Sequence, residues 1–307
     1  MLYKGNIINP DPYLKPCYKL SPFCNTDIKE NNEFPSSSCA SDYFKNKHKD
    51  LQFLYTTNGR AALNMALQSL NLNPNDIVSI LTTSQNFYIS GCVTREIEKF
   101  CKWDREVTSS TKVIFVNHEF GFPFGGMEEL RNFNIPIIED CAYSFSSQSK
   151  NSIVGHVGDF VIYSFPKFFP IQIGGMLAFR NNLELYKELP SEDLLYINNV
   201  ISPYLSFVDQ FSDLRRANYN YLEKEFKKYG LLTRFGELAK GVVPGVFMFK
   251  VPDHIDTGDL KNFFYANGVE SSVFYGESSF FIPCHHRLSK VDLDYFIILI
   301  DFYLNIK

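Results

Sequence analysis

The chain has 307 residues and a formal net charge of −4, with 45% hydrophobic and 21% charged residues. This composition excludes an intrinsically disordered chain, and the length suffices for one large domain or two modest ones. Because there is no overall basic field, we expect no nucleic-acid partner.

The first 48 residues are rich in proline, asparagine, serine and lysine and show little periodicity. They predict an irregular N-terminal arm, with room for one short helix. No basic start followed by an apolar stretch is visible, so we expect no signal peptide and a cytoplasmic protein. The seven cysteines are scattered and form no CxxC pair, which predicts neither a disulfide framework nor a zinc ribbon. The longest apolar run, residues 295–300, is too short for a membrane span, so we expect no membrane partner.

Short apolar runs alternate with helical patterns over residues 49–200, which predict a large domain. Strands are expected at residues 51–55, 77–81, 113–116, 136–138, 160–165 and 176–179, and helices at 60–70 and 87–100. This alternation favours βα units and a mostly parallel sheet.

The pattern changes over residues 201–307, where we predict a smaller α+β C-terminal domain. A helical stripe covers residues 207–226, and a strand is expected at 245–251. Two further helices are expected at 259–266 and 291–304, the second opened by Ser289 and Asp292 in a capping box.

Several common motifs are missing from the sequence. There is no GxxxxGK[ST] or GxGxxG loop, no HExxH and no GxSxG. His285 and His286 are adjacent, so regular structure would point them in different directions, and a loop or surface role is favoured over a metal site.

Two glycine-containing segments could bring backbone close to a ligand. Residues 57–63 form a glycine turn that enters a helix, and free amide groups there would suit a phosphate, although most such turns bind nothing. Gly174 and Gly175 precede a strand, where they permit close backbone approach or simply form a turn.

Polar residues follow two of the predicted strands. Asp140 comes directly after a buried strand, where α/β sheets bind ligands, although a helix N-cap is the alternative. Ser164 and Lys167 follow another strand. A lysine among phenylalanines would be partly desolvated, which favours the neutral amine that forms a Schiff base; a surface lysine is the alternative.

In this order and spacing, these segments resemble the DegT-type sugar aminotransferases, which are fold-type I enzymes that use pyridoxal 5′-phosphate (PLP). The matching segments are Gly59–Leu63, Asn86–Tyr88, Glu139–Tyr143, Gly155–Asp159, Ser164 with Phe165, Lys167, Gln172–Gly175, Val116–Gly121, Arg215 with Arg216, and Ile282–Ser289. The resemblance covers about residues 50–305 and indicates a short, divergent member. It implies a large PLP-binding α/β domain, with a mostly parallel mixed sheet between helices, and a smaller α+β domain.

The resemblance also implies roles for individual residues. Lys167 would hold the cofactor as an internal aldimine and move the proton, and Asp140 would pair with the pyridine nitrogen. The backbone of Gly59 and Arg60, together with the Ser164 hydroxyl, would hold the phosphate. Phe87 would stack on the ring, and Tyr143 would lie near the ring hydroxyl.

The implied reaction transfers an amino group, from glutamate as the usual donor, to a nucleotide-linked keto-deoxy sugar, as in polysaccharide biosynthesis. A homodimer is expected by analogy. Two alternatives stay open: a PLP-dependent sugar dehydratase, and a non-catalytic binding or regulatory relative. Dehydrating relatives replace the lysine by histidine, and no histidine lies between His156 and His254.

Three departures from the family pattern bear on these roles. The interval from Ser164 to Lys167 is about two residues shorter than in the family, and Gly-Glu-Gly-Gly is replaced by Gln172–Gly175. A loop that supplies an asparagine to the partner's phosphate site looks deleted. Its substitutes would come from Asn198, Asn199 and Asn220.

Overall fold

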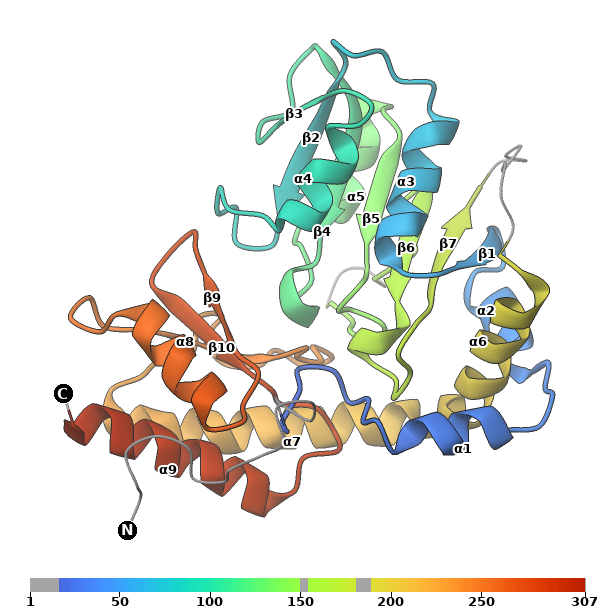
Figure 1. Ribbon diagram of the computed structural model, residues 1–307. Coiled ribbons are helices and arrows are strands. Elements are labelled where there is room, and N and C mark those ends of the chain that lie inside the picture. Colours follow the sequence, from blue (N-terminus) through green and yellow to red (C-terminus); the bar gives the residue numbers. More distant parts are fainter. Residues whose placement is uncertain (1–16, 150–153, 181–188, 307) are drawn as a thin grey trace.

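The computed structural model describes residues 17–149, 154–180 and 189–306 (Figure 1). Within these ranges, no helix combines the length and the apolar character needed to cross a bilayer. A large sheet with flanking helices lies beside a smaller sheet, and the long helix α7 (Val208–Phe226) runs beneath both (Figure 1).

The large sheet has seven strands in the order β1-β7-β6-β5-β4-β2-β3. Their bounds are β1 (Gln52–Thr56), β2 (Ile77–Thr82), β3 (Lys102–Asp104), β4 (Thr111–Asn117), β5 (Ile137–Asp140), β6 (Phe160–Ser164) and β7 (Gly175–Phe179). Strands β2 to β6 pair in parallel, whereas β7 pairs antiparallel with both β6 and β1. The segment between β6 and β7 is too short for a crossover helix, which accounts for the antiparallel pair. The predicted mostly parallel, mixed α/β sheet is confirmed.

Helices cover both faces of this sheet. On one face, α3 (Gly59–Ser69) and α4 (Gly91–Ile97) share one apolar core with Phe160 and Ile162 of β6. On the other, α2 (Cys39–Lys47) and α6 (Ser191–Tyr204) share a second apolar core with Val161 and Tyr163 of the same strand. Alternate residues of a strand face opposite sides, and both sides of β6 are buried. Residues on both sides are therefore apolar, which accounts for the uninterrupted apolar run in β6. The short helices of this region are α5 (Met127–Leu130), η1 (Glu119–Gly121), η2 (Arg131–Phe133) and η3 (Phe165–Lys167).

The N-terminal arm is more regular than the sequence predicted. It contains two helices, α1 (Asp27–Glu33) and α2, where at most one short helix was expected. Ala40 and Phe44 of α2 are fully buried against the large-sheet core. Because this helix is short and gains its stability from tertiary packing, its sequence has little periodicity to detect.

The smaller domain contains a three-stranded antiparallel sheet in the order β8-β10-β9. Its elements are α7, η5 (Lys227–Tyr229), β8 (Phe247–Lys250), α8 (Thr257–Ala266), β9 (Ser272–Phe274), β10 (Ser279–Ile282) and α9 (Lys290–Ile306), preceded by η4 (Leu205–Phe207). The expected capping box at α9 is present, because the Ser289 amide donates to the Asp292 carboxylate at 2.7 Å. The predicted domain boundary at residues 200/201 falls inside α6, whose Val200 and Ile201 belong to the large-sheet core.

Candidate active site

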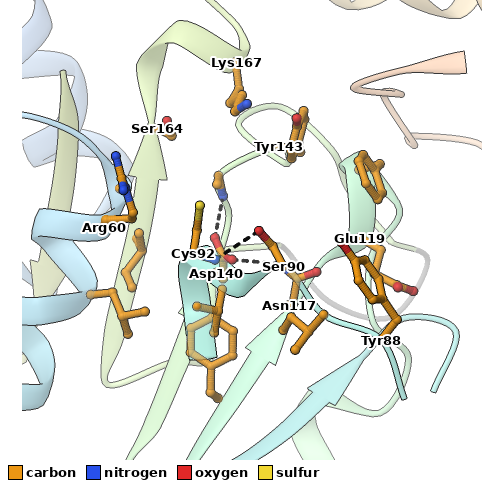
Figure 2. A pocket seen from close by; sticks show the side chains of 18 of the residues that line it. Arg60, Tyr88, Ser90, Cys92, Asn117, Glu119, Asp140, Tyr143, Ser164 and Lys167 are labelled. Carbon is orange, nitrogen blue, oxygen red and sulfur yellow. Dashed lines mark hydrogen bonds between the residues drawn. The ribbon is translucent and has the colours of Figure 1, made fainter. Parts of the chain in front are cut away.

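A cavity of about 560 Å³ lies between the carboxyl ends of β4 to β6, the N-terminus of α3 and the small sheet (Figure 2). Its charged lining side chains are Arg60, Glu119, Asp140 and Lys167. Gly59, Tyr143 and Ser164 also line it, so it brings together every predicted site residue except Phe87. Both domains contribute, because Ser272–Phe274 and Phe281 come from the small sheet.

Asp140 is the last residue of β5, and only 7% of it is exposed. One carboxylate oxygen accepts a hydrogen bond of 2.7 Å from the Asn117 side chain, and the other accepts one of 2.9 Å from the Ala142 amide. Burial raises the pKa of Asp140, while these two hydrogen bonds act against that rise. A buried carboxylate with only neutral donors favours a cationic partner in the cavity it faces.

Glu139, which precedes Asp140, is fully buried and does not line the cavity. Its carboxylate accepts hydrogen bonds from the amides of Gly155, Val157 and Gly158 at 2.5 to 3.2 Å. It also bonds to His118 Nε2 at 3.0 Å. Burial alone would raise the pKa of Glu139, but the hydrogen bond from His118 and those from the backbone lower it. This network fixes the end of β5, and with it Asp140.

The His118 ring has a defined hydrogen-bonding role. Its Nδ1 accepts a hydrogen bond of 2.9 Å from the Phe124 amide, so its Nε2 carries the hydrogen donated to Glu139. The ligand-type atoms of His118, Glu139 and Cys141 lie within 4.8 Å of one another. Because both Glu139 oxygens already accept hydrogen bonds, the arrangement is explained as a structural anchor.

Lys167 ends the short 3₁₀ helix η3 and is half-buried. Its Nζ lies 4.8 Å from the centre of the Tyr143 ring, and both side chains border the cavity (Figure 2). Attraction to the Tyr143 oxygen raises the pKa of Lys167 and outweighs desolvation, which alone would lower it. Desolvation does favour the neutral amine, as the sequence predicted, but Tyr143, whose contact with Lys167 the sequence did not reveal, favours the ammonium more strongly.

The turn at the start of α3 has the geometry of an anion site. The Asn58 side chain accepts a hydrogen bond from the Ala61 amide at 3.0 Å, which leaves the Gly59 and Arg60 amides at the helix N-terminus. Ser164 lies beside this turn, because a Cβ on Gly59 would lie 3.4 Å from the Ser164 Cβ. The Arg60 side chain lines the cavity on the same side (Figure 2).

Gly174, which precedes β7, and Gly175, its first residue, contact the back of this turn. A Cβ on Gly175 would lie 2.7 Å from backbone atoms of both Asn58 and Tyr163. The Gly174 amide donates to the Thr57 carbonyl at 2.7 Å. Of the two interpretations left open for this pair, close backbone approach is the one that the structure bears out.

Phe87 is not where the resemblance implied. It is 71% exposed, contacts Trp103 and is absent from the cavity lining. The turn explains the displacement, since the Asn86 side chain accepts from the Tyr88 amide and donates to the Gly276 carbonyl. Tyr88 lines the cavity in its place. Helix α4 begins only at Gly91, after the Ser90 cap, so the predicted helix over 87–100 is shorter at both ends.

The side of the cavity that faces the small domain is aromatic, with rings from both domains. Phe120, Phe274 and Phe281 line it, and the Phe120 ring lies 5.0 Å from Phe281. Phe274 packs edge-on against Tyr88 at 4.9 Å. Sequence reasoning missed this wall, because its two sides are separated by more than 150 positions and carry no local motif.

The asparagines proposed for a partner's phosphate site have other contacts. Asn198 accepts hydrogen bonds from Ser41 and Tyr55, and Asn199 accepts one from the Ser37 amide. Both therefore hold α6 to the arm, whereas Asn220 is exposed on α7. His285 and His286 lie in the loop between β10 and α9, as one of the two expected roles has it, but they are buried, and the His286 ring stacks on Phe211 at 3.7 Å.

Asp140 thus ends β5 and Lys167 follows the neighbouring strand β6, in a mixed α/β sheet that is accompanied by a smaller C-terminal domain. The DegT/DnrJ/EryC1/StrS aminotransferase family model matches residues 100–189, a segment that contains Asp140 and Lys167. Over this segment the chain is similar to the family that its sequence motifs resemble.

A curated relative and two solved structures give the extent of the similarity. GDP-perosamine synthase of Escherichia coli O157:H7 is 30% identical over 166 residues, which are 47% of this chain and 45% of that protein. The chain spans about half the length of the curated relatives it matches. The aminotransferase TlmJ from Streptoalloteichus hindustanus matches in fold with a TM-score of 0.71 at 15% identity, covering 91% of this chain and 94% of that one. The E. coli GDP-4-keto-6-deoxy-D-mannose-3-dehydratase with bound hydrated PLP has a TM-score of 0.68 at 14% identity, covering 92% and 98%.

Proposed function

We propose that this chain is a PLP-dependent aminotransferase that acts on a nucleotide-linked keto-deoxy sugar. One observation carries the proposal: a buried carboxylate, a lysine and a helix N-terminus surround a single cavity of about 560 Å³. The relation to GDP-perosamine synthase supports a sugar nucleotide as the substrate class.

The residues present fit PLP. Asp140 is buried with two neutral hydrogen-bond donors, so it would hold the proton on the pyridine nitrogen. The amides of Gly59 and Arg60 would bind the phosphate together with the Ser164 hydroxyl, and the Arg60 guanidinium adds positive charge on the same side. When bound, PLP supplies an electron sink for the carbon that carries the transferred amino group.

Lys167 would be the amine that binds the cofactor and then moves the substrate proton. Its Nζ must be neutral to accept that proton, and contact with Tyr143 raises its pKa. Because its pKa is raised, Lys167 needs a higher pH to become the neutral amine that can accept the proton. Tyr143 would hold the Lys167 amine in one orientation, and its phenol would donate a hydrogen bond to the cofactor near the ring hydroxyl.

The aromatic wall would exclude water and pack against the substrate. The rings of Phe274, Phe281 and Tyr88 border the cavity together with Asp140. Apolar faces of sugar rings and nucleobases stack on such surfaces. Glutamate as the donor and a homodimer with a site completed by the partner are parts of the same proposal.

The side chain at position 167, in the turn after β6, distinguishes amino transfer from dehydration. The chain has Lys167 there, which supports amino transfer, although a dehydratase shares the fold. Products separate the two: amino transfer incorporates ¹⁵N from labelled glutamate into the sugar, whereas dehydration leaves the sugar without that nitrogen.

The test is covalent attachment of PLP. Purified protein is mixed with PLP, reduced with borohydride and digested, and the peptide that contains Lys167 is examined by mass spectrometry. We expect the PLP adduct on Lys167 and a visible absorption band, both lost in Lys167→Ala and retained in Lys228→Ala. A folded protein that forms no adduct would contradict the proposal and favour the non-catalytic relative.

A further inference from the structure

Arg215 of α7 is an unusual buried cation. It is 1% exposed, and in the described part of the chain all its hydrogen-bond acceptors are backbone carbonyls. Its two terminal nitrogens donate to the carbonyls of Lys167 (3.0 Å), Phe168 (3.5 Å), Pro244 (3.4 Å) and Gly245 (3.4 Å). One guanidinium therefore joins the turn after β6 to the segment before β8.

Burying this charge is unfavourable. Burial lowers the pKa of Arg215 to about 10, and its Nε lacks a hydrogen-bond partner among the described residues. A buried cation without a carboxylate is normally a poor way to gain stability. Packing over the Phe168 ring at 5.0 Å offsets part of this cost.

Both backbone segments lie against the two side chains that meet in the cavity, Lys167 and Tyr143. The first carries Lys167 itself, and the Ser21 hydroxyl holds the preceding carbonyl, that of Pro166, at 2.7 Å. The second carries Gly245, on which the Tyr143 ring rests: a Cβ there would lie 2.4 Å from the Tyr143 Cδ1. Movement of either segment would change the separation of Lys167 Nζ from the Tyr143 ring.

We propose that Arg215 is a positioning residue that holds Lys167 and Tyr143 against each other by binding the backbone beneath both. It also accounts for the shortened turn after Ser164, because that turn gains anchors from α7 and from the arm. The inference rests on the proposed role of Lys167 as the reactive amine.

Arg215 could act on Lys167 through its charge or through the position that it imposes. The two effects would change the pKa of Lys167 in opposite directions, so an experiment can separate them. Removing a nearby cation relieves repulsion and would raise the pKa of Lys167. Loss of the Tyr143 contact would lower it, because Tyr143 is the main cause of its rise. Glu270, Cys92 and Asp140 also interact electrostatically with Lys167, and the substitution at Arg215 leaves all three unchanged.

The experiment measures the Lys167 amine in the protein without PLP. Trace acetic anhydride is applied across a pH series, and acetylation of the Lys167 peptide is quantified by mass spectrometry. In Arg215→Met we expect the reactivity of Lys167 below its pKa to rise about threefold to tenfold, the scale of one typical net hydrogen bond. In a Tyr143→Phe background, the same substitution should cause no further rise.

Arg216→Met is the matched control, since Arg216 pairs with Asp213 at the surface of the same helix. If Arg215→Met does not fold, Gly245→Ala tests the same contact, because its Cβ displaces the Tyr143 ring, and it should raise Lys167 reactivity similarly. Unchanged or reduced reactivity in a folded Arg215→Met or Gly245→Ala variant would overturn the proposal. Because no PLP is present, this result is independent of whether PLP binds.

Discussion

Asn117 and Asp140 are register partners at the ends of the parallel strands β4 and β5, and the Asn117 amide donates to the Asp140 carboxylate at 2.7 Å. The parallel pairing thus delivers both side chains to one edge of the sheet. The hydrogen bond favours the ionised form of a carboxylate whose pKa burial raises.

Asn117→Leu should weaken PLP binding. Without the donor, the ionised form of Asp140 is less favoured, and so is its pairing with a protonated pyridine nitrogen. We expect the dissociation constant to rise about threefold to tenfold, the scale of one typical net hydrogen bond. Absorbance titration measures it, and the exposed Asn75→Ala serves as the control. Equal affinity of Asn117→Leu and wild type would count against this role of Asn117.

The two residues of the loop before α4 should behave differently. Tyr88→Ala removes a ring from the cavity wall and should raise KM for the sugar substrate by about tenfold, the cost of losing one aromatic contact. Phe87→Ala should have little effect, since its ring contacts Trp103 outside the cavity. Steady-state kinetics of the two variants decide the matter, and a larger effect at Phe87 would contradict the assignment.

The sequence predicted the lining of the cavity better than its surroundings. Asp140, Ser164 and Lys167 meet there because each lies at or just after the end of an apolar strand, and parallel pairing brings strand ends together. Phe87 was misplaced by one residue, because a hydrogen bond from Asn86 to the distant Gly276 sets the turn. Such long-range contacts leave no local pattern. The same holds for α2, which is stabilised by burial of Phe44, and for the carbonyls bound by Arg215.

Gly175→Ala should destabilise the protein. Its Cβ would lie 2.7 Å from backbone atoms on two sides, where no flexible side chain can move away. We expect a loss of about 1 to 3 kcal/mol in the free energy of unfolding, together with weaker phosphate binding. Urea denaturation measures the first. Gly125→Ala is the control, because nothing lies within 4 Å of its added carbon.

Glu139→Gln should change how stability depends on pH. Hydrogen bonds lower the folded-state pKa of Glu139, so its contribution is fully present above the unfolded value of 4.5 and is lost as the pH falls through the folded value. At neutral pH the variant should be less stable by about 3 kcal/mol, because the introduced side-chain amide would turn an N–H group toward backbone donors. The gap should narrow in acid. Denaturation of both proteins between about pH 3 and 7 tests this, and a gap that stays constant would contradict it.

The account depends most on whether Lys167 binds PLP covalently. Borohydride reduction in the presence of PLP, followed by peptide mass spectrometry, measures this directly in wild type, Lys167→Ala and Lys228→Ala. We predict the adduct on Lys167 in wild type and in Lys228→Ala, with the visible band lost only in Lys167→Ala. A folded wild-type protein with no adduct at saturating PLP, or an adduct on another lysine, would contradict the account.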